Sequence, residues 1–125
     1  MKKAIKIKNA PAPLGPYSQA ILKGNTLYGS GQIAIDPITG EFKMDTIKDE
    51  TTQVMKNIEA ILTAADMTFD HVVKCSIFLS DMHNFGSVNE VYASFFGDVP
   101  PARETVEVAC LPKNVNVEIS FIAER

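Results

Sequence analysis

Two charged residues near the end of the sequence are candidates for chemistry, an arginine that could bind a carboxylate and a nearby acid. Arg103 follows the rigid dipeptide Pro100-Pro101, and Glu118 lies in the next strand-like run. A guanidinium fork can hold a carboxylate through two parallel hydrogen bonds, which a lysine cannot do. The alternative is a surface ion pair between Arg103 and Glu118, which would contribute little free energy.

Other residue types that carry chemistry form no recognisable constellation. His71 and His83 have no ligand-like companions at helix or finger spacing, so we expect no metal ion and no other cofactor. Cys75 and Cys110 lack a CxxC spacing, and each adjoins an apolar run. We therefore expect two buried free thiols in a reducing compartment.

The composition argues against membrane and nucleic-acid partners. Twelve basic residues against fifteen acidic ones give a net charge of -3, whereas nucleic-acid-binding domains usually carry a basic excess. The lysines of residues 2–8 alternate with apolar residues, as on the solvent side of a protected edge strand. No run approaches the ~18 apolar residues of a membrane helix, and the N-terminus does not resemble a secretory signal. We expect a cytoplasmic protein.

The chain of 125 residues is expected to form one domain, residues 1–125, with the element order β-β-β-α-β-α-β-β. Hydrophobic patterning predicts six strands, at residues 2–8, 17–22, 27–35, 71–80, 102–109 and 115–123. Pro11, Pro13, Gly15 and Pro16 predict a rigid loop after the first strand. Lys23-Gly24-Asn25 predicts a hairpin turn.

Two helices are predicted, each with one apolar face. Thr46 caps the first, which ends near Met67. Its apolar face carries Val54, Met55, Ile58, Ile61 and Leu62, and its opposite face carries Gln53, Lys56, Asn57 and Glu59. The second helix follows Asp81 and ends before Gly97, with an apolar face of Phe85, Val88, Val91, Tyr92 and Phe95. We expect an α+β fold with both helices on one face of a single sheet.

Side-chain alternation in the last two strands predicts which residues face the helices. Val106 and Val108 share one face of the first of these strands, whereas Arg103, Thr105 and Glu107 share the other. In the second strand Val115, Val117, Ile119 and Phe121 alternate with Asn116, Glu118 and Ser120. If the valine sets face the helices, Arg103 and Glu118 share the remaining face.

The sequence resembles the reactive intermediate deaminases, the RidA or YjgF family, along its whole length. The motifs that carry the resemblance are residues 10–20 (APAPLGPYSQA), 30–33 (SGQI), 101–103 (PAR), 106–108 (VEV) and 117–119 (VEI). Residues 53–58 (QVMKNI) and 88–92 (VNEVY) are similar as well. Any one of these strings occurs by chance, but their order and separations together are specific.

The resemblance implies a chorismate-mutase-like fold of the bacillus type, with one mixed sheet and two helices on one face. It implies a homotrimer with sites between subunits, which agrees with a sheet face that no helix covers. It also implies hydrolysis of 2-imino acids and their enamine tautomers, such as 2-aminoacrylate and 2-aminocrotonate, to 2-oxo acids and ammonia. Dehydratases that use pyridoxal phosphate would release these substrates. The activity that the resemblance implies is that of a 2-iminobutanoate/2-iminopropanoate deaminase without a cofactor.

The resemblance also assigns roles to individual residues. Arg103 matches the arginine that binds the substrate carboxylate, and Glu118 matches the acid that positions the attacking water. Tyr17 and Ser30 match hydroxyl groups that orient the imine nitrogen or relay a proton. Gly31 matches a position where the backbone approaches the substrate closely.

Two further matches are supporting residues, and one of them departs from the family pattern. Asn89 matches a helix asparagine with a structural role. Thr105 stands where many relatives have cysteine, so any thiol-dependent activity is in doubt here. Two alternatives remain open. One is a non-catalytic regulatory module that binds 2-oxo acids, and the other is an RNA-binding protein or endoribonuclease that inhibits translation, against which the acidic charge counts.

Overall fold

The computed structural model describes residues 1–7 and 15–125. Its elements are β1 (Lys3–Ile5), β2 (Ala20–Lys23), β3 (Thr26–Gln32), α1 (Ile47–Ala64), β4 (Val72–Leu79), α2 (Phe85–Ala93), β5 (Ala102–Glu107) and β6 (Val117–Glu124). Three short 3-10 turns are η1 (Phe69–His71), η2 (Met82–Asn84) and η3 (Pro112–Asn114). The predicted order of elements is confirmed. Lys8, Pro11 and Pro13, which the strand and loop predictions include, lie outside the described residues.

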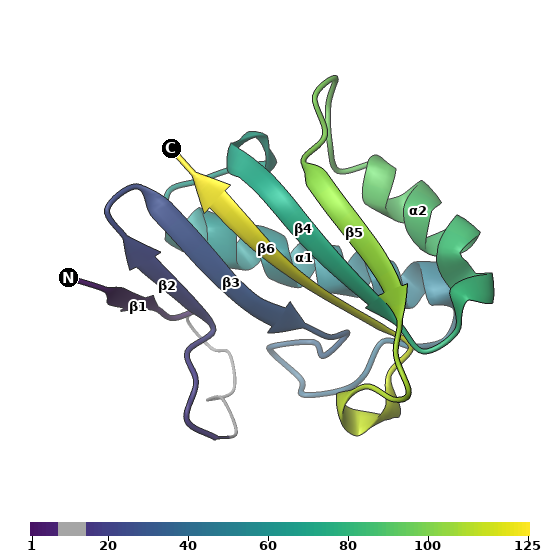
Figure 1. The fold of residues 1–125 in the computed structure, drawn as a ribbon. Helices are drawn as coiled ribbons and strands as arrows, with labels where there is room; N and C mark the ends of the chain where they lie inside the picture. The colour runs from purple at the N-terminus through teal and green to yellow at the C-terminus, as the bar shows by residue number, and fades with distance from the viewer. Residues whose placement is uncertain (8–14) are drawn as a thin grey trace.

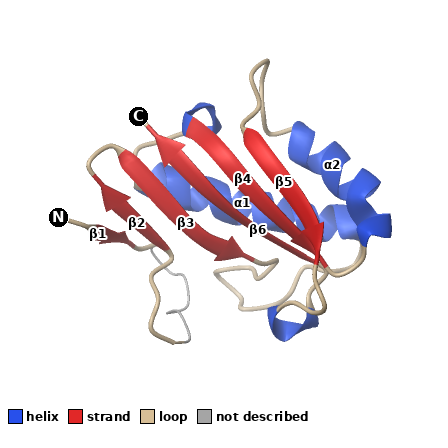
Figure 2. Ribbon diagram, viewed as in Figure 1, coloured by secondary structure: helices blue, strands red, loops and turns tan. Residues whose placement is uncertain are grey.

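The described strands form one six-stranded mixed sheet in the order β1-β2-β3-β6-β4-β5. Only β4 and β5 pair in parallel, and α2 connects them. Figure 1 shows α1 crossing behind the sheet and α2 beside β5, and Figure 2 shows the same arrangement by type of element. Since α1 packs against β3, β6 and α2, both helices belong to one layer. The α+β fold with one mixed sheet is confirmed.

The first helix forms where the sequence predicts it. The Thr46 hydroxyl accepts a hydrogen bond from the Asp49 amide and so satisfies one of the free N–H groups of the first turn. The five predicted apolar positions of α1 are buried against the sheet: Val54, Met55, Ile58, Ile61 and Leu62. Asp66, with φ 57°, follows the C-terminal end of the helix in the left-handed conformation.

Three local predictions are wrong. Asn57 is buried on the sheet side of α1, because its amide donates to the Ile33 and Ile35 carbonyls. These two bonds take up carbonyls beyond Gln32, and β3 ends there. Asp81 caps η2 instead of α2. Cys110 is exposed in the loop after β5, whereas Cys75 is buried as expected.

Candidate functional site

The Arg103 guanidinium is held on the helix side of the sheet. Arg103 lies in register with Cys75, whose side chain belongs to the core between the sheet and the helices. Its guanidinium carbon is 5.1 Å from the Tyr92 ring centroid and 5.4 Å from that of Phe85. One guanidinium N–H donates to Asn89 Oδ1 at 2.7 Å. Two ring faces and one hydrogen bond therefore determine the orientation of Arg103.

These three partners lie on one face of α2. Phe85, Asn89 and Tyr92 have the spacing of four and three residues that places side chains on one stripe of a helix. Sequence analysis assigned the two aromatic residues to the core and missed their contact with the arginine. The same spacing beside an arginine-bearing strand was the signal that could have revealed it.

A hollow of about 430 Å³ lies beside the guanidinium, a volume in the range of small-molecule sites. Its lining residues are Asn89, Tyr92, Ala93, Phe96, Gly97, Pro100, Pro101 and Arg103. Burial, followed by the neighbouring Cys75 thiol, raises the pKa of the Tyr92 hydroxyl, so this group stays protonated. Thr105, on the same side of β5, has a buried hydroxyl without a hydrogen-bond partner among the described residues.

Glu118 lies on the opposite, open face of the sheet. It pairs with Phe78 of β4, while its neighbours Val117 and Ile119 are fully buried on the helix side. Burial raises the pKa of the Glu118 carboxyl above its ordinary value. A side-chain carbon at Gly31 would lie only 2.7 Å from Glu118 Cδ and Oε2. The carboxyl therefore rests against the bare backbone of Gly31.

Ser30 links the end of β3 by hydrogen bonds to the residues that follow Tyr17. The Ser30 hydroxyl donates to the Ser18 carbonyl at 2.6 Å, and the Ser30 amide donates to the Gln19 carbonyl at 2.9 Å. The pairing of β3 with β6 shifts between Gly29 and Gln32, so Ser30 and Gly31 lie in an irregularity of the ladder. Tyr17 is 55% exposed. The structure thus brings Gly31 to Glu118, with Ser30 next to Gly31 in the chain and Tyr17 just before β2.

The prediction that Arg103 and Glu118 share one face is wrong, and so is the orientation predicted for Val106. Val106 is 40% exposed on the open face, on the same side as Glu104, which forms an ion pair with Lys74. The reason is that β5 is an edge strand packed against two aromatic rings of α2. The long Arg103 side chain covers these rings while its charged end stays accessible.

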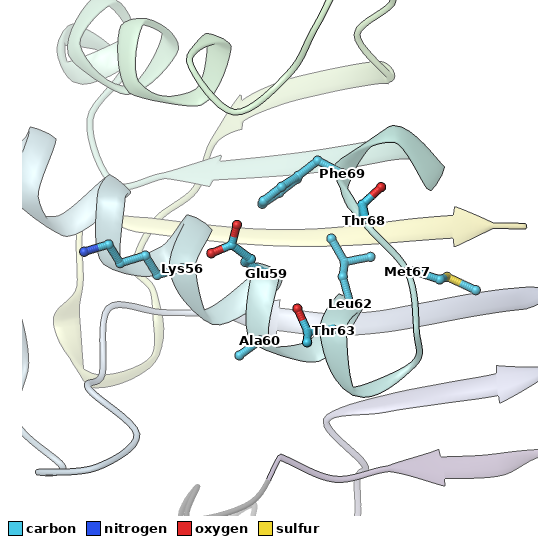
Figure 3. Close-up of a pocket in the computed structure, with 8 residues that line it drawn as sticks. All are labelled: Lys56, Glu59, Ala60, Leu62, Thr63, Met67, Thr68 and Phe69. Atoms are coloured by element: carbon cyan, nitrogen blue, oxygen red, sulfur yellow. The ribbon is translucent and has the colours of Figure 1, made fainter.

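A second hollow, of about 410 Å³, lies between α1 and η1 and is shown in Figure 3. It is lined by Lys56, Glu59, Ala60, Leu62, Thr63, Met67, Thr68 and Phe69, and none of these is a predicted site residue. Residues 1–7 and 15–125 contain no group of three His, Cys, Asp or Glu residues that could hold a metal ion. No helix in the same ranges has both the length and the apolar character needed to cross a membrane.

Comparison with known proteins identifies the family. The family model described as endoribonuclease L-PSP matches residues 7–125. A RutC family protein of Pyrococcus horikoshii is 54% identical over 98% of this chain and 98% of its own. Mouse 2-iminobutanoate/2-iminopropanoate deaminase is 43% identical over 98% of this chain and 91% of its own. The crystal structure of E. coli TdcF with bound serine has a TM-score of 0.92 and 38% identity, covering 98% of each chain. The chain therefore belongs to the endoribonuclease L-PSP family, the RidA/YjgF family whose motifs it carries.

Proposed function

We propose that this protein hydrolyses 2-imino acids and their enamine tautomers, such as 2-aminoacrylate and 2-aminocrotonate, to 2-oxo acids and ammonia. The observation that carries the proposal is the Arg103 guanidinium, oriented by Phe85, Tyr92 and Asn89 beside a hollow. Its other N–H groups have no acceptor within the described part of the chain and can bind a carboxylate bidentately. The deaminase named in mouse and the amino acid bound to TdcF support this substrate class.

The site lies between subunits of a homotrimer in this proposal. Arg103 and Glu118 occupy opposite faces of one sheet, so a single copy does not present both to one small substrate. In a closed ring, the Arg103 side of one copy can meet the Glu118 side of the next. Tyr28 and Val106, 50% and 40% exposed on the sheet face away from the helices, are the apolar surface that such an assembly would cover.

The chemistry follows from the position of each group. Arg103 binds the substrate carboxylate, and a hydroxyl of Tyr17 or Ser30 orients the imine nitrogen. Glu118 accepts a proton from water while the water oxygen adds to the imine carbon. The raised pKa of the Glu118 carboxyl makes it a stronger base. The proton that Glu118 accepted passes to nitrogen and gives a carbinolamine. The carbinolamine hydroxyl then passes its proton to nitrogen as the C–N bond breaks, and ammonia leaves with a 2-oxo acid. Fixed geometry and proton transfer suffice because such imines also hydrolyse spontaneously.

The test couples a serine or threonine dehydratase that uses pyridoxal phosphate to this protein and follows the decay of the imine and enamine absorbance. We expect faster decay with the wild type and the spontaneous rate with Arg103→Ala. Acceleration that survives in Arg103→Ala would move the site elsewhere. No acceleration with either imine, together with binding of 2-oxo acids, would favour the regulatory module instead.

Subunit mixing tests the shared site. Arg103→Ala and Glu118→Gln are each expected to be inactive, and they are unfolded together and refolded as mixed assemblies. Since each interface would take Arg103 from one copy and Glu118 from another, about one site in four should regain both groups. If the mixed assemblies are as inactive as each variant alone, Arg103 and Glu118 act in a site within one subunit.

A further inference from the structure

Two of the buried polar side chains of α1 hydrogen-bond to other elements of the fold. Glu50 is 0% exposed and Asn57 is 7% exposed. They are separated by seven residues, which is two turns, so they lie on the same face of the helix. A buried carboxylate is costly unless its oxygens are hydrogen-bonded, so the partners of Glu50 indicate what it does.

Glu50 binds the start of β6. Its Oε2 accepts hydrogen bonds from the Asn116 and Val117 amides at 2.8 and 3.0 Å, and its Oε1 accepts one from Asn116 Nδ2 at 2.8 Å. Val117 is the residue immediately before Glu118. The carboxylate therefore fixes the backbone from which the proposed general base projects.

Asn57 binds the segment that leaves β3. Its Nδ2 donates to the Ile33 carbonyl at 3.0 Å and to the Ile35 carbonyl at 2.8 Å. Its Oδ1 accepts from Gln53 Nε2 at 2.8 Å, which holds the amide in this orientation. Gly31, the backbone against which Glu118 rests, is two residues before Ile33.

We propose that Glu50 and Asn57 are positioning residues, which hold the Glu118 and Gly31 segments at the spacing that the reaction requires. Within residues 1–7 and 15–125, neither side chain hydrogen-bonds to Arg103 or α2, so they act on only one of the two sides of the site. The inference rests on the proposed function for its kinetic consequence, whereas its structural part can be tested without turnover.

The kinetic test compares Glu50→Ala, Asn57→Ala and Glu50→Gln in the dehydratase-coupled assay. Since Arg103 binds the carboxylate from the other side, we expect KM to stay within about twofold while kcat falls about 10²-fold in both alanine variants. Glu50→Gln should keep most of the wild-type kcat. Its Oε1 can accept from the Asn116 and Val117 amides, and its Nε2 can donate to Asn116 Oδ1 once that amide rotates.

Thr51→Val is the matched control. Thr51 is 0% exposed, and its hydroxyl donates to the Ile47 carbonyl within α1. This hydrogen bond involves neither the Glu118 segment nor the Gly31 segment. The Thr51→Val substitution removes a buried hydrogen bond from the same helix, and we expect its kcat to equal that of the wild type. If Glu50→Ala does not fold, Asn57→Ala decides, because it removes a neutral amide with its hydrogen bonds to Ile33, Ile35 and Gln53 and no charged group.

Hydrogen exchange of the Glu118 and Gly31 amides separates this inference from the proposed function. We expect exchange at these amides to be faster in the two alanine variants than in Thr51→Val. If the wild type shows no turnover, the proposed deaminase activity is refuted. The exchange rates would still show whether Glu50 and Asn57 hold the Glu118 and Gly31 segments. Unchanged exchange in both alanine variants, or a kcat equal to that of the wild type, would overturn the inference.

Discussion

The Glu118 carboxyl lies against the Gly31 backbone, close enough that a methyl group at residue 31 would be 2.7 Å from its Cδ and Oε2. Real side-chain carbons do not come so near, so the half-buried Glu118 side chain would have to shift away from residue 31. The contact makes residue 31 sensitive to the smallest possible substitution.

Gly31→Ala should therefore displace Glu118 without removing it. A displacement of about 1 Å can cost about 10²-fold in rate, so we expect a comparable fall in kcat in the coupled assay. Gly86→Ala is the control, because a side-chain carbon there meets nothing within 4 Å. Full activity in Gly31→Ala would show that the carboxyl does not need this position.

Arg103→Lys keeps the positive charge but loses the planar fork. A lysine cannot bind a carboxylate through two parallel N–H groups, nor stack on Phe85 and Tyr92 in the same way. We expect kcat/KM to fall by about 10²-fold or more, chiefly through KM. Binding of a 2-oxo acid, followed by calorimetry, checks the same point, and affinity equal to that of the wild type would contradict the bidentate contact.

Glu118→Gln should reduce activity and raise stability at neutral pH. Loss of a general base costs ~10²–10⁴-fold in rate. In the wild type, activity should rise with pH as the carboxyl ionises, through a pKa above its ordinary value of 4.5. A pH–rate profile of kcat/KM measures this limb, and a midpoint at or below 4.5 would contradict the raised pKa.

The stability effect of the same variant has a definite sign. Because burial raises the folded-state pKa of Glu118, the folded protein binds this proton more tightly than the unfolded chain does. The contribution of this group to stability is fully present below the unfolded pKa and is lost as pH rises through the folded pKa. Thermal unfolding should thus show Glu118→Gln to be more stable than the wild type at pH 7, with the difference shrinking in acid.

Thr105→Val should stabilise the protein. The Thr105 hydroxyl is buried without a partner among the described residues, and such a group costs about 1–3 kcal/mol. Valine has nearly the same shape, so denaturant unfolding should show a gain of about 1 kcal/mol. A loss of stability instead would mean that an acceptor from outside the chain, such as a second copy, binds this hydroxyl.

The features that follow from hydrophobic periodicity could be predicted from the sequence. Those that depend on contacts between separate elements could not. The apolar positions of α1 from Val54 to Leu62 were right, because one stripe of a helix must face the sheet. The faces of β5 were assigned wrongly, since alternation separates two sets of side chains without saying which one meets the helices. Val106 was the more apolar choice, yet Arg103 covers the rings of α2.

Buried polar groups were the other source of error. Patterning assigns Asn57 to solvent because it is polar, but its partners are carbonyls more than twenty residues away in the chain. Glu50 escaped notice for the same reason, since its N–H donors belong to β6. The candidate residues Arg103, Glu118, Ser30 and Gly31 came from motifs, and their grouping into two separate sides could not be read from motifs alone.

The contacts of Arg103 with Phe85, Tyr92 and Asn89 also affect the thermodynamics of binding. A free arginine side chain has about 2 kcal/mol of rotamer entropy, which it loses wherever it becomes fixed. Here the Arg103 side chain loses this rotamer entropy when the protein folds. A carboxylate that binds the guanidinium therefore costs little additional side-chain entropy. Binding of small carboxylic acids should accordingly be driven by enthalpy, with only a weak entropic penalty from the protein.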